Sequence, residues 1–340
     1  MYYTREIEKP DDDPQVVALF AAFGLCRPEQ VETTLGLYEG RMLLACCSRR
    51  GNVLQGLAVC ADRQGENLTA QLLCRVIEQA ATQGLTHLLM FSRPDMENIF
   101  TSIGFAVVAR AEPHATLFEY GIPGIAEYQA VLREKARSFS GDSACIVMNA
   151  NPFTRGHLHL ATLASQEHSH VWILVVQEDR SQFPFANRIQ LVRTGVAHLP
   201  NVAVLPGGEY TISSSAFPSY FTKKTLLAEA QAALDAAIFA SRIAPALGVT
   251  TRYVGTEPTC EVSRIYNTML AERLPPYGIS LREIPRLEHD GVAVSASAVR
   301  DSLMRNLPDK TASLVPPGTL EFLRSEEAKA VIARIRDGNS

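Results

Sequence analysis

The sequence predicts two domains of mixed α and β structure, an α+β domain followed by an α/β domain with a parallel sheet. The chain has 340 residues, and roughly 150 residues per domain indicates about two domains. From residue 144 onward, apolar segments alternate with helical patterns, which is typical of a parallel sheet. The turn-forming cluster Gly121-Ile122-Pro123-Gly124 ends the first half. We therefore expect domains at 1–124 and 143–340, joined by a helix and loop at 125–142.

The composition is that of an ordinary globular protein. Hydrophobic residues make up 46 % and charged residues 20 %, and the formal net charge is −4. This apolar content with a small net charge excludes intrinsic disorder for most of the chain. A mildly acidic chain is also a poor candidate for non-specific nucleic-acid binding.

The sequence favours a cytoplasmic protein. Its densest apolar run, 171–176, is far shorter than the ~20 residues that span a bilayer, and the N-terminus lacks the basic-then-apolar order of a signal peptide. The seven cysteines form no C-x-x-C pair, so we expect neither a metal site nor a disulfide framework. Scattered cysteines of this kind are typical of a reducing compartment.

Hydrophobic periodicity predicts the elements of each half. In the first half we expect strands at 41–47, 53–60, 87–91 and 105–110, and helices at 68–83 and 97–103. After the boundary we expect strands at 144–148, 171–176, 202–205, 251–254 and 279–284, and helices at 125–137, 156–166, 186–197, 223–243 and 297–303.

One motif lies where the first strand of the second half ends and a helix begins. In an open α/β sheet, ligands bind beyond the carboxyl ends of the strands, and a helix N-terminus there attracts phosphate. Gly156 lets the backbone come close to a phosphate, while the Thr154 hydroxyl and the His157 ring can bond its oxygens. The preceding residues that we expect beside a nucleotide are Asn149, Asn151 and Phe153.

A second motif, Val294-Ser295-Ala296-Ser297-Ala298-Val299-Arg300, lies near the C-terminal end. Ser297 has the chemistry of a helix N-cap, and Arg300 follows in the expected first turn, facing the same anion site. The planar guanidinium fork matches the β and γ phosphates of a nucleotide. The alternative is an ordinary capped helix with a solvated arginine.

Other positions support these motifs. Gly255 and Glu257 follow a strand and border the expected pocket, and Arg188 heads a helix from which it can reach a triphosphate. Lys223 and Lys224 have the same potential, although a solvated helix start explains them equally well. The stretch 213–224 is our candidate for the acceptor region.

These residues resemble known families. Thr154 to His157 resembles the T/H-x-G-H motif of Rossmann-like nucleotidyltransferases, and 294–300 resembles their I-S-S-T-x-x-R motif, with Ala296 in place of a serine. Nearly the whole chain resembles the citrate lyase ligase family. The further stretches that carry this resemblance are 148–154, Phe183-Pro184-Phe185, Phe217-Pro218-Ser219-Tyr220-Phe221, Glu257-Pro258 and Ile265-Tyr266-Asn267.

The resemblance implies an enzyme that activates acetate with ATP and Mg²⁺, giving acetyl-AMP and diphosphate. The acetyl group then passes to the thiol of the 2'-(5''-phosphoribosyl)-3'-dephospho-CoA prosthetic group on the citrate lyase acyl carrier subunit, which activates the lyase. Thr154 and His157 would stabilise the α-phosphate, and Arg300 would bind the departing diphosphate. The implied partners are the carrier subunit and acetate, with no nucleic acid and no membrane.

The first domain resembles the GNAT N-acetyltransferase fold. Gln64, Gly65 and Asn67 occupy the place of that fold's pyrophosphate-binding loop, and asparagine tolerates the left-handed backbone region. Phe100 stands where many members carry a tyrosine, so its hydroxyl proton donor is absent. Two hypotheses remain: the domain holds the CoA-like arm of the carrier, or it is a scaffold whose ligand loop has decayed.

Two other functions remain open at this point. One is an adenylyltransferase that acts on a phosphorylated small molecule, and the other is a non-catalytic nucleotide sensor. The reaction product separates the first from acetate activation, because a dinucleotide is stable whereas an acyl-AMP is consumed by a thiol.

Overall fold

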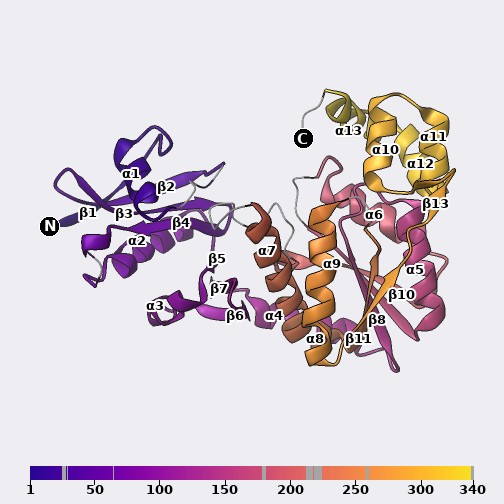
Figure 1. Cartoon of the computed structure of the whole chain (residues 1–340), viewed down its shortest axis with the longest axis horizontal. Helices are drawn as coiled ribbons and strands as arrows, with labels where there is room; N and C mark the ends of the chain where they lie inside the picture. Colours follow the sequence, from indigo (N-terminus) through magenta and orange to yellow (C-terminus); the bar gives the residue numbers. More distant parts are fainter. Residues whose placement is uncertain are drawn as a thin grey trace. The chain divides into compact units, whose positions relative to one another are not determined.

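The computed structural model describes residues 1–24, 28, 30–63, 65–177, 181–211, 217, 224–257 and 260–337. The chain divides into two compact units (Figure 1). The first comprises Met1–Tyr128 and Ala216–Ala237, and the second comprises Gln129–Ser215 and Ile238–Ser340.

The first unit is built on a mixed sheet with the order β1-β2-β3-β4-β5-β7-β6. Its strands are β1 (Tyr2–Glu6), β2 (Thr33–Glu39), β3 (Met42–Arg50), β4 (Val53–Val59), β5 (His87–Ser92), β6 (Ala106–Ala111) and β7 (Ala115–Gly121). Neighbouring strands are antiparallel except β4 and β5, which are parallel. The parallel pair matches only at Val53 with Leu89 and Leu54 with Met90, so the two strands separate beyond that point.

Three helices accompany this sheet, α1 (Pro14–Ala22), α2 (Leu68–Thr82) and α3 (Glu97–Ile103). Asp13 caps α1 by accepting hydrogen bonds from the backbone of Gln15 and Val16. Leu72, Leu73 and Val76 on α2 belong to the core that the sheet contributes to. Their spacing places them on one face of the helix, so burial of that face holds α2 to the sheet.

The second unit is built on a parallel sheet with the order β10-β9-β8-β11-β12. Its strands are β8 (Ser143–Met148), β9 (His170–Val175), β10 (Val202–Pro206), β11 (Val249–Gly255) and β12 (Ser280–Ile284). The strand order reverses at β8, because β9 follows on one side and β11 lies on the other. Such a switch point opens a crevice at the carboxyl ends of the strands.

Helices complete the second unit. They are α4 (Ile125–Ala136), which begins in the first unit, α5 (Arg155–Glu167), α6 (Phe185–Val196), α8 (Ala244–Leu247), α9 (Glu261–Arg273), α10 (Ala296–Met304), α11 (Pro308–Leu314), α12 (Pro317–Arg324) and α13 (Glu326–Arg336). α7 (Lys224–Ile238) belongs to the first unit except for its last residue, and a π-helical segment, Phe239–Ile243, joins it to α8. A short hairpin of β13 (Glu288–His289) and β14 (Val292–Ala293) precedes α10.

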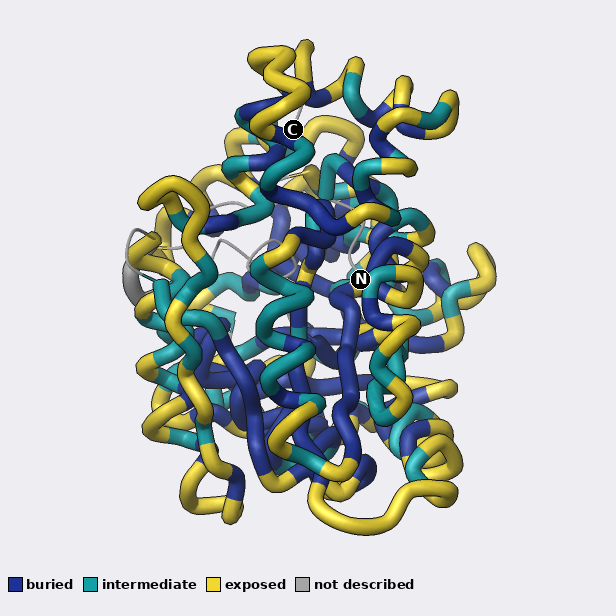
Figure 2. Tube along the Cα trace, turned by 90° about the vertical axis from the view of Figure 1, so that its right-hand side faces the viewer, coloured by how far each residue is buried: buried dark blue, intermediate teal, exposed yellow. Residues whose placement is uncertain are grey.

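The main core of the second unit lies on one face of the parallel sheet. Ile146 and Ile173 pack there with Ala161 of α5 and Val192 of α6. A second cluster joins the C-terminal helices through residues such as Val299, Leu314 and Val331. In Figure 2 the buried residues, in dark blue, follow the strands, and the exposed residues, in yellow, gather in turns and on outer helix faces.

The predicted mixed α/β class and the parallel sheet are confirmed. The predicted strand at 144–148 corresponds to β8, and the helix at 97–103 has the exact bounds of α3. The sequence analysis missed β1, α1, β2 and β7 in the first unit, and α9, the hairpin of β13 and β14 and α11 to α13 in the second. Within the described ranges, no helix is both long and apolar enough to traverse a bilayer.

Gly121 ends β7 at a point that has no room for a side chain. Its φ is +87°, and a methyl group there would lie 1.8 Å from the Thr86 carbonyl oxygen. Gly51, in the turn between β3 and β4, also has a positive φ, but a methyl group there would meet nothing within 4 Å. Both positions strain the backbone of any other residue, but only Gly121 also lacks room for a methyl group. Substituting each glycine by alanine therefore distinguishes the cost of strain from the cost of steric overlap.

We expect Gly121→Ala to lower the free energy of unfolding by roughly 2–4 kcal/mol, because strain and overlap add. Gly51→Ala should cost only about 1 kcal/mol. Urea unfolding of the two variants measures the difference. Equal losses would contradict the steric argument.

Candidate functional site: a phosphate-binding edge of the parallel sheet

The candidate site lies at the carboxyl edge of β8 and β11. The loop that follows β8 carries Asn149 to Thr154 and leads into α5, and Thr256 and Glu257 follow β11. Because both loops leave the same edge at the switch point, they border the crevice where a ligand of this sheet binds.

Thr154 and His157 form a reciprocal cap at the start of α5. The Thr154 hydroxyl accepts a hydrogen bond from the His157 backbone N–H at 3.3 Å, and the Thr154 backbone N–H donates to His157 Nδ1 at 3.0 Å. Because Nδ1 accepts a backbone proton, the neutral ring carries its own proton on Nε2. The cap therefore fixes both the tautomer and the direction of the remaining N–H donor.

The environment keeps the His157 ring neutral. Burial, followed by the positive charge of Arg286, lowers the pKa of His157 from its usual value near 6.5 to about 4. The ring also stacks on Phe153, with ring centroids 5.7 Å apart and an interplanar angle of 15°. His157 therefore offers an N–H donor without a full charge.

Gly156 joins the two predicted motifs. A methyl group at Gly156 would lie 2.8 Å from the backbone carbonyl oxygen of Val294. The residue after Val294 is Ser295, whose hydroxyl accepts a hydrogen bond from the Ala298 backbone N–H at 3.1 Å and caps α10. The absent side chain of Gly156 thus allows the start of α5 to approach the start of α10.

The prediction that Ser297 is the N-cap is wrong. Ser295 is the cap, and Ser297 lies within α10, where its hydroxyl accepts a hydrogen bond from Arg300 at 3.2 Å. The two serines both suit a cap, and the extended backbone of Ser295, with φ −134° and ψ 157°, decides between them.

Arg300 reaches from α10 back to the first motif. Its Nη1 donates to the Asn151 carbonyl oxygen at 2.7 Å. Burial lowers the pKa of the Arg300 guanidinium, but an arginine stays charged in proteins. The structure therefore brings the cation of the second motif to the loop of the first, as the sequence predicted.

Arg188 differs from its prediction. It is fully buried, with Nη1 donating to the carbonyl oxygens of Asn149 and Val176 at 2.7 and 2.8 Å and Nε donating to that of Phe183 at 3.0 Å. Nη1 also donates to the Asn149 side-chain oxygen at 2.7 Å. Arg188 therefore lies beneath the loop and holds it, instead of reaching a triphosphate.

Asn149 and Asn151 have different surroundings. The Asn149 amide nitrogen donates to the Ser181 hydroxyl at 3.0 Å, and the residue is exposed at the crevice. The Asn151 side-chain oxygen accepts from the Phe183 backbone N–H at 3.0 Å. Asn149 is therefore available to a ligand, whereas Asn151 ties the loop to the chain before α6.

Arg286 is a functional candidate that the sequence analysis missed. It follows β12, and its Nε donates to the Thr256 carbonyl oxygen at 2.7 Å, while Nη2 pairs with the buried Glu257 carboxylate. A methyl group on Gly255 would meet Arg286 Cγ at 3.9 Å. The sequence contained one sign of this role, because Arg286 is a basic residue shortly after a predicted strand, at the edge of the sheet that carries both motifs.

The assembled site suits an anion. His157 Nε2–H, Arg300 and Arg286 are all donors, and α5 and α10 both begin there with backbone N–H groups and positive dipole ends. The phosphate contact expected of Thr154 stays a prediction, because the described contacts of its hydroxyl lie within the cap. In the part of the chain that the structure describes, no cluster of His, Cys, Asp or Glu side chains is arranged to hold a metal ion.

In the first unit, the predicted pyrophosphate loop precedes α2. Asn67 is left-handed, with φ 59°, and caps α2 without a side-chain hydrogen bond, while Gly65 has φ +93°. Between them, the Glu66 carboxylate accepts from Arg63 Nε and from the Tyr2 hydroxyl, both at 2.6 Å. Gln64 lies outside the described residues, as do Lys223 and most of the predicted acceptor region at 213–224.

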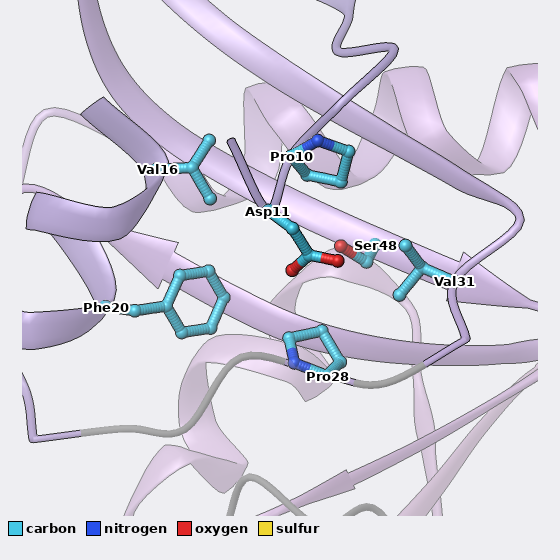
Figure 3. A pocket seen from close by; sticks show the side chains of 7 residues that line it. All are labelled: Pro10, Asp11, Val16, Phe20, Pro28, Val31 and Ser48. Carbon is cyan, nitrogen blue, oxygen red and sulfur yellow. The ribbon is translucent and has the colours of Figure 1, made fainter. Parts of the chain in front are cut away.

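A separate small pocket lies beneath α1 in the first unit (Figure 3). It is lined by Pro10, Asp11, Val16, Phe20, Pro28, Val31 and Ser48. Its cavity volume is about 10 Å³, roughly the room that one water molecule needs. The Asp11 carboxylate points into it and would repel a phosphate, so this pocket is not a nucleotide site.

The contact at Gly156 gives a first test of the site. We expect Gly156→Ala to lower the free energy of unfolding by roughly 1–3 kcal/mol, because the methyl group must push the Val294 backbone away. Gly255→Ala is the matched control for stability, since its methyl group would make only an ordinary contact. Chemical denaturation compares them, and equal stability of the two variants would refute the close approach.

The pKa of His157 gives a second test. Between pH 6.5 and 4 the unfolded chain binds this proton and the folded chain does not, so this residue makes stability fall as the pH drops through that window. At higher pH both states are neutral and the effect disappears. Histidine ring NMR should show a resonance that titrates near pH 4 and is absent from His157→Gln; titration near 6.5 would contradict the burial of the ring.

Comparison with known proteins shows the family of this chain. Residues 143–323 match the model of the citrate lyase ligase C-terminal domain. A [citrate [pro-3S]-lyase] ligase of Escherichia coli K12 is 35 % identical over 303 residues, which is 87 % of this chain and 85 % of the relative. The corresponding protein of Klebsiella pneumoniae is 36 % identical over 294 residues, covering 84 % of each chain.

A third relative with the same name, from Haemophilus influenzae, is 34 % identical and covers 87 % of this chain and 90 % of its own length. Among solved structures, a putative acyl-CoA N-acyltransferase of Klebsiella pneumoniae matches 36 % of this chain and 99 % of its own, with 16 % identity and a TM-score of 0.31. From the family model and the curated relatives together, this chain belongs to the citrate lyase ligase family.

Proposed function

We propose that the chain activates citrate lyase by acetylating the thiol of the 2'-(5''-phosphoribosyl)-3'-dephospho-CoA group on its acyl carrier subunit, through acetyl-AMP. The observation that carries the proposal is the junction of the two motifs at Gly156 and Val294. It gathers a neutral histidine donor, an arginine and two helix N-termini at one crevice. Membership of the citrate lyase ligase family supports the reaction class.

The first step is the adenylation of acetate. An acetate oxygen attacks the α-phosphorus of ATP, and the bond from this phosphorus to the bridging oxygen of the β-phosphate breaks. Acetyl-AMP forms and diphosphate leaves, accompanied by the Mg²⁺ that enters with ATP. Catalysis of phosphoryl and nucleotidyl transfer depends mainly on positioning and charge stabilisation.

The residues of the second unit suit these tasks. His157 donates its Nε2–H to the α-phosphate, and its Nδ1 bond to the Thr154 backbone keeps that donor aimed. Arg300 binds the β- and γ-phosphates from α10, and Asn149 lines the same crevice. Thr154 and Arg188 position His157 and Asn149 from below.

The second step transfers the acetyl group. The carrier thiolate attacks the acetyl carbonyl of acetyl-AMP, the bond to the AMP oxygen breaks, and AMP leaves as the thioester forms. The thiol proton goes to solvent. The left-handed Asn67 and Gly65 before α2 support a role for the first unit in holding the CoA-like arm of the carrier.

Acetate-dependent exchange of labelled diphosphate into ATP tests the first step. We expect the full chain to catalyse this exchange, and His157→Ala to reduce it about 100-fold or more, the usual loss when one oxyanion donor is removed. His159→Ala is the matched control, because His159 lies on the same helix but outside the motif. It should retain the wild-type rate.

Other outcomes point to the other functions. Exchange that requires a phosphorylated co-substrate instead of acetate would make the chain an adenylyltransferase. Binding of ATP without exchange, in the presence of acetate and the carrier subunit, would make it a nucleotide sensor. Wild-type exchange by His157→Ala would remove the histidine from the proposed mechanism.

A further inference from the structure

Arg286 has one edge of its guanidinium fixed by the protein and another edge to which no described residue is hydrogen-bonded. Nε donates to the Thr256 carbonyl oxygen at 2.7 Å and Nη2 pairs with Glu257. Its backbone N–H donates to the Thr256 hydroxyl at 3.2 Å, so the main chain is fixed as well. Among the described residues Nη1 makes no hydrogen bond, and the side chain is 30 % exposed.

The backbone around Arg286 connects it to both motifs. The next residue, Leu287, accepts a hydrogen bond at its carbonyl oxygen from the Val294 N–H at 2.8 Å. Val294 in turn presents its carbonyl to Gly156 at the start of α5. Arg286 is therefore held between the end of β11 and the N-terminus of α5.

On the side of α9, the positive charge of Arg286 is paired with the Glu257 carboxylate. Its Glu257 partner also accepts the Cys260 backbone N–H at 3.2 Å, on the side of α9. Toward α5, the positive charge of Arg286 acts on His157 and lowers the pKa of that ring. Two hydrogen-bond donors close to each other are a setting for an anion.

We propose that Arg286 is a substrate-binding residue of the adenylation site, whose Nη1 edge holds an oxyanion beside His157. This rests on the proposed function, which supplies two such oxyanions, the phosphates of ATP and the carboxylate of acetate. Thr256 and Glu257 keep the guanidinium plane fixed, so that binding requires no reorientation of the side chain. Arginine suits this position because its fork bonds the protein with one edge and the ligand with another.

Direct binding of ATP with Mg²⁺ to the full chain tests the first source of the oxyanion. If the ligand is a phosphate, calorimetry of Arg286→Met should show affinity for ATP weakened about 10- to 100-fold, the usual effect of losing a charge-assisted hydrogen bond in a partly buried site. Arg286→Lys should recover part of that loss, because it restores the charge but not the fork. The thermal midpoint of each variant is measured alongside.

The matched control is Arg282→Met. Arg282 lies on β12, four residues before Arg286, and pairs with Glu167 at the opposite end of α5, so this variant loses the same charge from a nearby position. We expect its affinity for ATP to stay within about twofold of wild type. A loss equal to that of Arg286→Met would mean that net charge alone is responsible and would overturn the proposal.

The KM for acetate tests the second possible oxyanion, the carboxylate of acetate. In the exchange assay, a ligand role toward acetate raises the KM for acetate about 10-fold or more in Arg286→Met and leaves the binding of ATP unchanged. Histidine ring NMR adds a readout that a purely structural role does not move. Adding ATP, or acetate with ATP, should raise the pKa of His157, and the rise should be smaller in Arg286→Met than in the wild type, because the oxyanion that Arg286 holds is then lost.

The outcomes separate this inference from the proposed function. Weak ATP binding by Arg286→Met together with a wild type that shows no acetate-dependent exchange would support Arg286 and reject acetate activation. Unchanged ATP affinity together with an unchanged KM for acetate in Arg286→Met would reject Arg286 while acetate activation stands. A wild type that binds no ATP would reject both.

Discussion

The site depends on the close approach of Gly156 to the carbonyl oxygen of Val294. The two residues are far apart in the sequence, and no strand pairing joins them directly. Their contact puts the first turn of α5 against the residue that precedes the cap of α10. A glycine at position 156 is therefore as important to the site as the donors around it, because a larger residue would push the starts of α5 and α10 apart.

Once the helix starts are joined, the donors become fixed before a substrate arrives. The Thr154 backbone holds the ring of His157, Ser297 and the Asn151 carbonyl hold Arg300, and Thr256 with Glu257 holds Arg286. Each of these groups uses a backbone or side-chain acceptor of a neighbouring loop. Fixed donors in a partly buried crevice stabilise developing charge more effectively than donors that must reorient first.

The sequence predicted the parts of this site that depend on local pattern. The T-x-G-H motif and the strand before it were recognisable because the apolar run of β8 is followed by an Asn-Pro-Phe turn and then by a helix start. Arg300 was expected three residues after a cap at Ser297; the cap is Ser295, so Arg300 lies beyond the first turn of α10, yet it still reaches the Asn151 carbonyl. These features are encoded within about ten neighbouring residues each.

The parts that depend on long-range packing were not predictable. Arg188 was predicted to bind phosphate because it lies near the start of a helix. Its Nη1 donates instead to the Asn149 oxygens in the loop after β8, and the sequence does not show that this loop comes close. Arg286 was missed because its partners, Thr256 and Glu257, follow β11, and the sequence does not show that β11 and β12 are neighbours in the sheet. Ser295 and Ser297 were confused because both can cap, and the backbone conformation decides.

The complete burial of Arg188 has an evolutionary consequence. Its cation has no access to water and is satisfied by carbonyl groups and by the Asn149 side chain, and a buried charge that loses a partner is costly. Residues 149 and 188 should therefore vary as a pair among related chains, and exchange of one alone should be purged by selection. An exposed position at the mouth of the crevice is in this way constrained by a fully buried residue.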